Sequence, residues 1–166
     1  MAQLRFGRLP PDLSFWHPAA LTATWGGSGL LPGAPGTWGS LATLPFAWLI
    51  ASYWGTAGLL IAAAAAFVGG MLATGRYLKA STSKDPGAIV IDETAGQFLA
   101  LALVPLDLWW YAAGFGLFRA FDILKPWPAS WADRSLPGAW GVMVDDLVAG
   151  ANALLILFVA GRLLAG

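Results

Sequence analysis

The sequence predicts an all-α, multi-helical integral membrane protein, one membrane-embedded domain over residues 1–166 with short or re-entrant helices. Two observations carry this prediction. Hydrophobic residues make up 58% of the chain and charged residues 11%, whereas soluble domains average about 25% charged. Positions 40–75 contain no charged residue, while positions 118–150 contain seven. Because charge beside a bilayer is costly, these seven are candidates for function.

The first 25 residues are expected to lie along the membrane interface, since Trp16 and Trp25 are of the type that collects there. An ordinary surface helix is the alternative. Residues 26–40 hold six glycines and two prolines, which argues against a helix. The turn Pro35-Gly36-Thr37 precedes a hydrophobic helix, so its backbone amides could contact phosphate. A linker or hinge is the other interpretation.

Hydrophobic stretches predict the remaining helices. They are expected over residues 40–53, 56–78, 93–105, 108–121 and about 147–164. The aromatic stretch 52–56 separates the first two, and Pro105-Leu106-Asp107 separates the third from the fourth. The third and fourth helices are each too short to cross a bilayer fully, which takes ~20 residues. Partial insertion is therefore expected for these two.

The distribution of cations predicts the topology. With the N-terminus inside and the turns at 53–56 and 105–108 outside, most cations lie on the inner face, as the positive-inside rule requires. These are Arg5, Arg8, Arg76, Lys79, Lys84, Arg119, Lys125 and Arg134. The acids of the charged segments fall on the same face. A multi-pass protein with its charged site facing the cytoplasm is expected.

Several kinds of chemistry are excluded by composition. There is no cysteine, which excludes disulfides, Cys-ligated zinc and a thiol nucleophile. His17 is the single histidine, so no histidine pair can bind a metal or share acid–base work. The formal net charge is zero, so nothing favours binding of nucleic acid through bulk charge.

Two pairs of adjacent carboxylates stand at predicted helix starts, Asp92-Glu93 and Asp145-Asp146. A helix dipole favours an acid at its N-terminus, but it does not explain adjacent acids that repel each other. Sharing a hard cation relieves that repulsion, and oxygen ligands suit Mg²⁺. The predicted metal ligands are Asp92, Glu93, Asp122, Asp145 and Asp146.

Three further charges recur at intervals of three residues, at Arg119, Asp122 and Lys125. They would share roughly one face if the helix continues to Lys125. Arg119 and Lys125 could then hold phosphate oxygens. The alternative is that both cations simply pair with Asp122.

Five ordered motifs span the chain from about Trp25 to its end. They are Pro35-Gly36-Thr37-x-Gly39-Ser40, Asp92-Glu93-x-x-Gly96, Phe118-Arg119-x-x-Asp122-x-x-Lys125-Pro126-x-Pro128, Asp133-Arg134 and Gly141-x-Met143-x-Asp145-Asp146-x-x-Ala149-Gly150. Together they resemble the phosphatidylglycerophosphatase A family. The resemblance implies a bacterial inner-membrane, Mg²⁺-dependent phosphatase that converts the phospholipid phosphatidylglycerophosphate to phosphatidylglycerol and inorganic phosphate.

The motif residues supply the candidate site. The catalytic candidates are Asp92, Glu93, Asp122 and Asp146, and the phosphate-binding candidates are Thr37, Arg119, Lys125 and Arg134. Either Asp92 or Asp146 would orient the attacking water, and a carboxylate nucleophile stays open. The competing class is a small cation-coupled membrane carrier without enzymatic activity. A carrier needs charges near the bilayer midplane, whereas these lie at helix ends and in loops.

Overall fold

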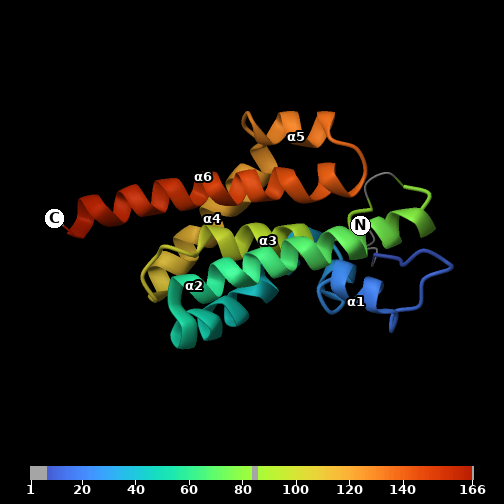
Figure 1. Cartoon of the computed structure of the whole chain (residues 1–166), viewed down its shortest axis with the longest axis horizontal. Helices are drawn as coiled ribbons and strands as arrows, with labels where there is room; N and C mark the ends of the chain where they lie inside the picture. The colour runs from blue at the N-terminus through green and yellow to red at the C-terminus, as the bar shows by residue number, and fades with distance from the viewer. Residues whose placement is uncertain (1–6, 84–85, 166) are drawn as a thin grey trace, which may run out of the picture.

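The computed structural model describes residues 7–83 and 86–165, and every regular element in those ranges is helical (Figure 1). The elements are α1 (Pro18–Ala23), the 3-10 helix η1 (Ser28–Leu30), α2 (Pro35–Ala80), α3 (Ile91–Ala100), α4 (Leu108–Leu124), α5 (Ala129–Ser135) and α6 (Ala139–Ala165). The predicted all-α class is confirmed. Arg5 and Lys84, two of the cations used for the topology, lie outside the described residues.

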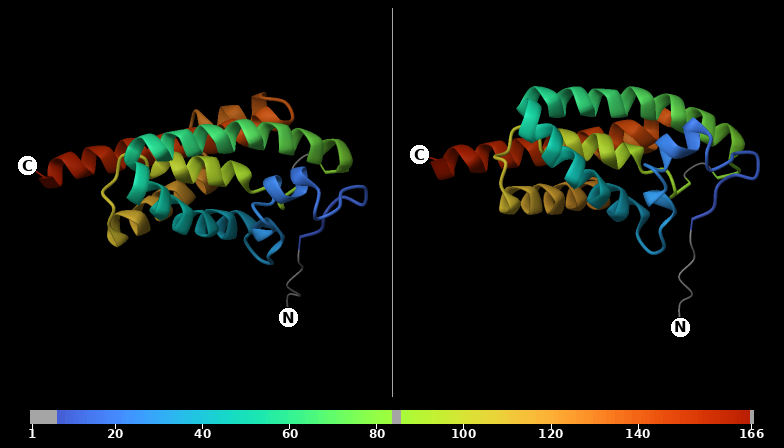
Figure 2. Two further views of the ribbon diagram at one scale, coloured as in Figure 1. Left: turned by 60° about the horizontal axis from the view of Figure 1, so that its bottom comes forward. Right: turned by 90° about the horizontal axis from the view of Figure 1, so that it is seen from below.

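Helix α2 consists of two arms that meet at Gly55. This glycine has φ 57° and ψ −149°, a conformation open to glycine but strained for other residues. The chain turns back there, as Figure 2 shows, so the predicted break at 52–56 is confirmed. The predicted start at residue 40 is wrong. The helix begins at Pro35, whose fixed φ suits a first helical turn, and Thr37 therefore lies inside the helix.

Helix α3 lies at the centre of the molecule, between α2 and α6 (Figure 1). The backbones of α3 and α6 come close together where the two helices cross. A Cβ atom added at Gly150 would lie 2.4 Å from the carbonyl oxygen of Gly96, and one added at Gly96 would lie 2.6 Å from that of Asp146. Small residues at the crossing therefore set how closely the acidic start of α3 approaches α6.

The connection from α3 to α4 runs through the predicted turn at Pro105-Leu106-Asp107. The Asp107 carboxylate accepts hydrogen bonds from the amides of Trp109 at 2.9 Å and Trp110 at 3.2 Å, which caps α4. Helix α3 ends at Ala100, earlier than expected, while α4 runs on to Leu124. The turn is thus confirmed, although the two arms differ in length from the prediction.

Three features of the C-terminal third differ from the prediction. Lys125 has a left-handed backbone, φ 43°, which ends α4 before it can share a face with Arg119. Helix α5 was not anticipated. Helix α6 begins at Ala139 instead of near 147, so Asp145 and Asp146 lie in its second turn and do not open it. Hydropathy had placed the start after the acids, because only the following residues read as a membrane helix.

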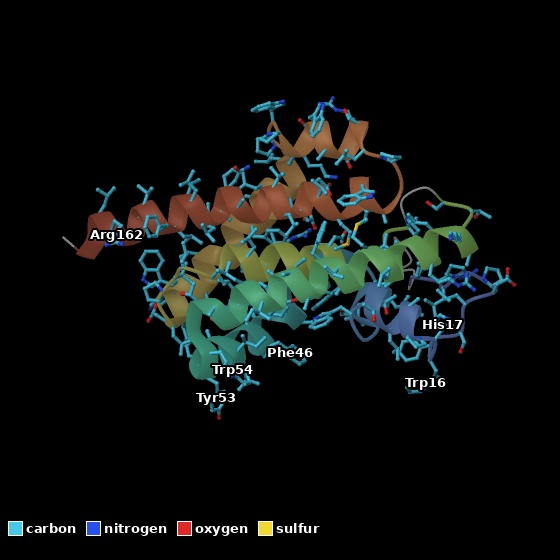
Figure 3. All side chains as sticks on the ribbon, viewed as in Figure 1. Trp16, His17, Phe46, Tyr53, Trp54 and Arg162 are labelled. Atoms are coloured by element: carbon cyan, nitrogen blue, oxygen red, sulfur yellow. The ribbon has the colours of Figure 1, made fainter. Side chains whose placement is uncertain are left out.

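Two helices, α2 and α6, have the length and composition needed to cross a membrane. In each, only 22% of the most apolar window is buried, so hydrocarbon side chains such as Leu72 and Leu163 face outward. Tyr53 and Trp54 project from the turn of α2 (Figure 3) and are 76% and 67% exposed. Aromatic residues placed there fit an interfacial position.

The segment before α2 packs against its second arm. Leu13, Ala20 and Ala23 are buried there, and the carbonyl of Ala23 accepts a hydrogen bond from the Val90 amide at 2.8 Å. This bond ties the N-terminal segment to the residue that precedes α3. The opposite side remains open, with Trp16 78% exposed. That residues 1–25 lie at the membrane interface stays a prediction, and residues 1–6 lie outside the described part.

Candidate active site

A cavity of about 940 Å³ opens where α3 and α6 begin and α4 ends. It is lined by eight of the predicted site residues, Asp92, Glu93, Arg119, Asp122, Lys125, Arg134, Asp145 and Asp146. Thr37 is not among the lining residues, although the adjacent Pro35 and Gly36 are. Pro35 and Asp146, which lie 111 positions apart in the chain, thus face one space. The contribution of Thr37 to phosphate binding stays a prediction.

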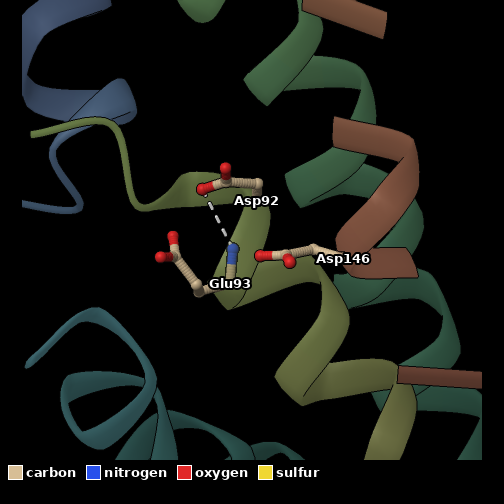
Figure 4. Close-up of side chains that lie close together, drawn as sticks. All are labelled: Asp92, Glu93 and Asp146. Carbon is tan, nitrogen blue, oxygen red and sulfur yellow. Dashed lines mark hydrogen bonds between the residues drawn. The ribbon is translucent and has the colours of Figure 1, made fainter. Parts of the chain in front are cut away.

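Three carboxylates form an inner cluster, Asp92, Glu93 and Asp146 (Figure 4). Each offers an oxygen, and these oxygens all lie within 4.8 Å of one another. Asp92 and Asp146 are only 8% and 3% exposed. The Asp92 carboxylate also accepts a hydrogen bond from the Glu93 amide at 3.0 Å, which fixes its direction in the first turn of α3.

The electrostatics of the inner cluster favour a bound cation. Burial, followed by the charge of Glu93, raises the pKa of Asp92 well above its ordinary value. Burial likewise raises the pKa of Glu93. Glu93 Oε2 is buried and has no hydrogen-bond partner among the described residues. Three converging carboxylates, one of which has a buried oxygen without a partner among the described residues, match the ligands of a hard divalent cation.

Gly36 makes room for two of the functional side chains. A Cβ atom at this position would lie 2.1 Å from Glu93 Oε1 and 2.9 Å from Arg119 Nη1. The motif Pro35-Gly36-Thr37 therefore contributes space beside the site, because any larger residue would displace the carboxylate and the guanidinium. Sequence reasoning had assigned this turn only an anion-binding or hinge function.

Arg119 links the inner cluster to Asp122. Its Nη1 atom donates to Asp122 Oδ2, one helical turn further along α4, and lies 3.8 Å from Glu93 Oε1. Both side chains are mostly buried, with 14% and 13% exposed. The predicted pairing of Arg119 with Asp122 is thus observed. Asp122 lies beside the inner cluster and not within the set of three converging oxygens.

Lys125 forms an outer cluster with Asp133 and Asp145. Its Nζ atom donates to Asp133 Oδ1 at 2.7 Å and to Asp145 Oδ2 at 2.6 Å. Burial alone would lower the pKa of Lys125, but the hydrogen bonds to the two carboxylates outweigh it and raise that pKa. Asp145 is therefore neutralised by a side chain of the protein. The structure separates it from the acids with which it had been grouped.

Asp133 is a motif residue to which the sequence analysis assigned no task in the site. It comes within reach of Lys125 because α4 ends there and the separate helix α5 folds back. Its neighbour Arg134 is exposed, and its Nε atom donates to the Ser130 carbonyl at 2.9 Å. No ion pair to Arg134 occurs within the described ranges 7–83 and 86–165. Arg134 therefore presents its remaining guanidinium donors to the cavity edge.

The chain is similar to proteins of known families over most of its length. Residues 21–161 match the family model described as phosphatidylglycerophosphatase A. A protein of that name from Escherichia coli is 41% identical over 89% of this chain and 84% of its own length. A second, from Haemophilus influenzae, is 40% identical over 88% of this chain and 90% of its own.

A third relative has a different name. The putative phosphatidylinositol-3-phosphatase of Bacteroides thetaiotaomicron is 37% identical over 84% of this chain and 91% of its own length. No solved structure matches the chain significantly.

Proposed function

This chain belongs to the phosphatidylglycerophosphatase A family, and we propose that it hydrolyses phosphatidylglycerophosphate to phosphatidylglycerol and inorganic phosphate in the cavity described above. The observation that carries the proposal is the inner cluster, three converging carboxylates of which Asp92 and Asp146 are buried, facing a cavity that also presents Arg119. None of the relatives supports the alternative of a cation-coupled carrier.

Mg²⁺ is the proposed cofactor, held by Asp92, Glu93 and Asp146. When bound, it would polarise the phosphomonoester and lower the pKa of a water molecule. Asp122 and Asp145 are assigned other tasks, because each already hydrogen-bonds a cationic side chain. The proposed ligand set is thereby reduced from the five acids expected from the sequence to three.

The other residues act on the substrate and on each other. Arg119 binds the phosphoryl oxygens through its planar guanidinium, which matches phosphate geometry, and balances the charge that develops during transfer. Asp122 holds that guanidinium in place from the same helix face. Either Asp92 or Asp146 accepts the proton of the attacking water, as expected for a general base in contact with it. Lys125 positions Asp145 and, through Asp133, helix α5.

The proposed location is the bacterial inner membrane, with the two arms of α2 and helix α6 as spans and the cavity facing the cytoplasm. Supporting this orientation, the second arm of α2 carries Arg76 and Lys79 at its C-terminal end, where the neighbouring Leu78 and Ser81 line the cavity, whereas Tyr53 and Trp54 lie at the turn where this arm begins. That arrangement follows the positive-inside rule. The proposed partners are therefore the phospholipid substrate and the membrane, with no nucleic acid expected.

Phosphate release from purified protein tests the function. Protein in detergent should release phosphate from phosphatidylglycerophosphate, stop after exhaustive EDTA treatment and resume when Mg²⁺ is added. Mg²⁺ should also raise the thermal unfolding midpoint, since a ligand present at 100 times its dissociation constant stabilises by about 2.7 kcal/mol. Phosphatidylinositol 3-phosphate belongs in the same assay, because the name of the Bacteroides relative concerns that head group. Full turnover in EDTA would remove Mg²⁺ from the proposal.

A further inference from the structure

The cavity is larger than a phosphoryl group requires. Its volume of about 940 Å³ falls in the range of pockets that enclose a whole drug-sized ligand. It extends from the buried carboxylates of α3 to the exposed residues of α5, Asp133 and Arg134. The space therefore accommodates a head group beyond the atoms that react.

Two guanidinium groups line this cavity at different depths. Arg119 is 14% exposed and lies against Glu93 and Asp122. Arg134 is exposed, comes from another helix and forms no ion pair with any residue of the described part. Lys125 lies in the outer cluster, where two carboxylates already neutralise it. Arg134 is consequently the cation at the rim that is free to receive an anion.

The proposed substrate carries two phosphates, and this inference rests on the proposed function. One is the terminal phosphomonoester that is hydrolysed. The other is the phosphodiester that joins the head group to the diacylglycerol, three glycerol carbons away. With the monoester at the inner cluster, the diester lies toward the lipid and hence toward the cavity edge.

We propose that Arg134 binds the phosphodiester and thereby selects lipids that carry both a phosphodiester and a terminal phosphomonoester. Its Nε atom is held by the Ser130 carbonyl, so the guanidinium is oriented before substrate arrives. Ile123 and Leu124 at the C-terminal end of α4, and Trp127 on the turn that follows, are exposed apolar residues, and Ile123 also lines the cavity. They offer a surface for the acyl chains on the same side as the diester.

A local structural role for Arg134 predicts a different outcome. The residue lies in the last turn of α5, where any cation stabilises the helix dipole by about 0.3–1 kcal/mol. Loss of this effect would lower the stability of the enzyme and would therefore reduce its activity on all substrates equally. Discrimination between lipids therefore separates substrate recognition from helix stabilisation.

The test compares Arg134→Gln with wild type on phosphatidylglycerophosphate and on phosphatidic acid, whose single phosphate is a monoester. We expect KM for phosphatidylglycerophosphate to rise about tenfold or more, as for a lost hydrogen bond to a charged group, with kcat nearly unchanged. Hydrolysis of phosphatidic acid should stay at its wild-type level. The matched control is Arg162→Gln, which removes a cation stacked on Phe158 at the opposite end of α6.

Product inhibition supplies a second readout. Phosphatidylglycerol retains the diester and lacks the monoester, so Arg134→Gln should weaken its inhibition while inhibition by inorganic phosphate stays unchanged. Equal losses on both lipids, or unchanged inhibition by phosphatidylglycerol, would overturn the assignment of Arg134. Failure of the proposed function is a separate result, because wild-type protein would then release no phosphate from phosphatidylglycerophosphate.

Discussion

Asp145 and Asp146 are neighbours in the sequence, yet they belong to clusters that differ in how their charge is balanced. Asp145 in the outer cluster shares the ammonium of Lys125 with Asp133, at 2.6 and 2.7 Å. Asp146 in the inner cluster meets two more carboxylates. The cation that approaches that cluster, Arg119 Nη1, stays 3.8 Å from Glu93 Oε1 and donates instead to Asp122.

The difference indicates which acids have a structural task and which need a cation from outside. A carboxylate that is hydrogen-bonded to a lysine is already stabilised in its charged form. Among the described residues no cationic side chain hydrogen-bonds the three carboxylates of the inner cluster, and Arg119, 3.8 Å from Glu93, balances at most one of their charges, so a metal ion would stabilise the rest. The outer cluster therefore connects α4, α5 and α6, whereas the inner cluster keeps charge available for chemistry.

The clusters also differ in what sets their spacing. Ion pairs between long side chains hold the outer cluster together. The inner cluster depends on the close backbone approach of α3 and α6 at Gly96 and Gly150. Substitutions of acids, glycines and the lysine can therefore test the two clusters separately.

The largest effect is expected from Asp146→Asn. Removing a proposed ligand should lower kcat/KM about 100-fold or more, since loss of even an outer-shell partner of a metal ligand costs 10–100-fold. Without Mg²⁺ the variant should unfold at the wild-type temperature or higher, because repulsion within the inner cluster is relieved. Addition of Mg²⁺ should no longer raise that midpoint. Phosphate release and thermal unfolding measure the two effects.

A matched control for this change is Asp107→Asn. Asparagine also caps helices well, so the bonds to the start of α4 persist and activity should remain at its wild-type level. Wild-type turnover in Asp146→Asn, or an undiminished Mg²⁺-induced shift, would contradict the assignment of the inner cluster.

A smaller effect is expected from Gly150→Ala. The added methyl would lie 2.4 Å from the Gly96 carbonyl oxygen, so α6 must move away from α3. We expect destabilisation of about 1–3 kcal/mol, as for other overpacked contacts, and a higher Mg²⁺ concentration for half-maximal activity. The control is Gly116→Ala on α4, where no atom lies within 4 Å and alanine should stabilise the helix. An unchanged Mg²⁺ requirement would show that the crossing does not set the ligand spacing.

The smallest effect on catalysis is expected in the outer cluster. Lys125→Met leaves Asp145 buried without its ion pair and should cost about 1–3 kcal/mol of unfolding free energy, with a modest loss of kcat. The double variant Lys125→Met, Asp145→Asn should recover part of that stability, because the unpaired charge is gone. Chemical denaturation measures both. A loss of activity as large as that of Asp146→Asn, with stability intact, would make Lys125 a substrate-binding residue.

Local signals predicted several features correctly. The acidic pair Asp92-Glu93 was placed at a helix start, where it is found, because a helix N-terminus attracts carboxylates within one turn. The turns at 52–56 and at Pro105-Leu106-Asp107 were also predicted correctly, because the residues in them affect the backbone at their own positions. Helix α5 and the true start of α6 escaped prediction, since the left-handed residues that precede them, Lys125 and Gly138, give no signal in hydropathy.

The sequence by itself determined the helical class, the family and the set of acids from which the site is built. Composition, short-range turn chemistry and ordered motifs can be read from the order of residues along the chain, so they do not require knowledge of the fold. Only the tertiary structure decided that Asp146 joins Asp92 and Glu93 while Asp145 pairs with Lys125. Adjacent residues on a helix point about 100° apart, and the packing of α3 on one side of α6 and of α5 on another assigns each carboxylate to its partners.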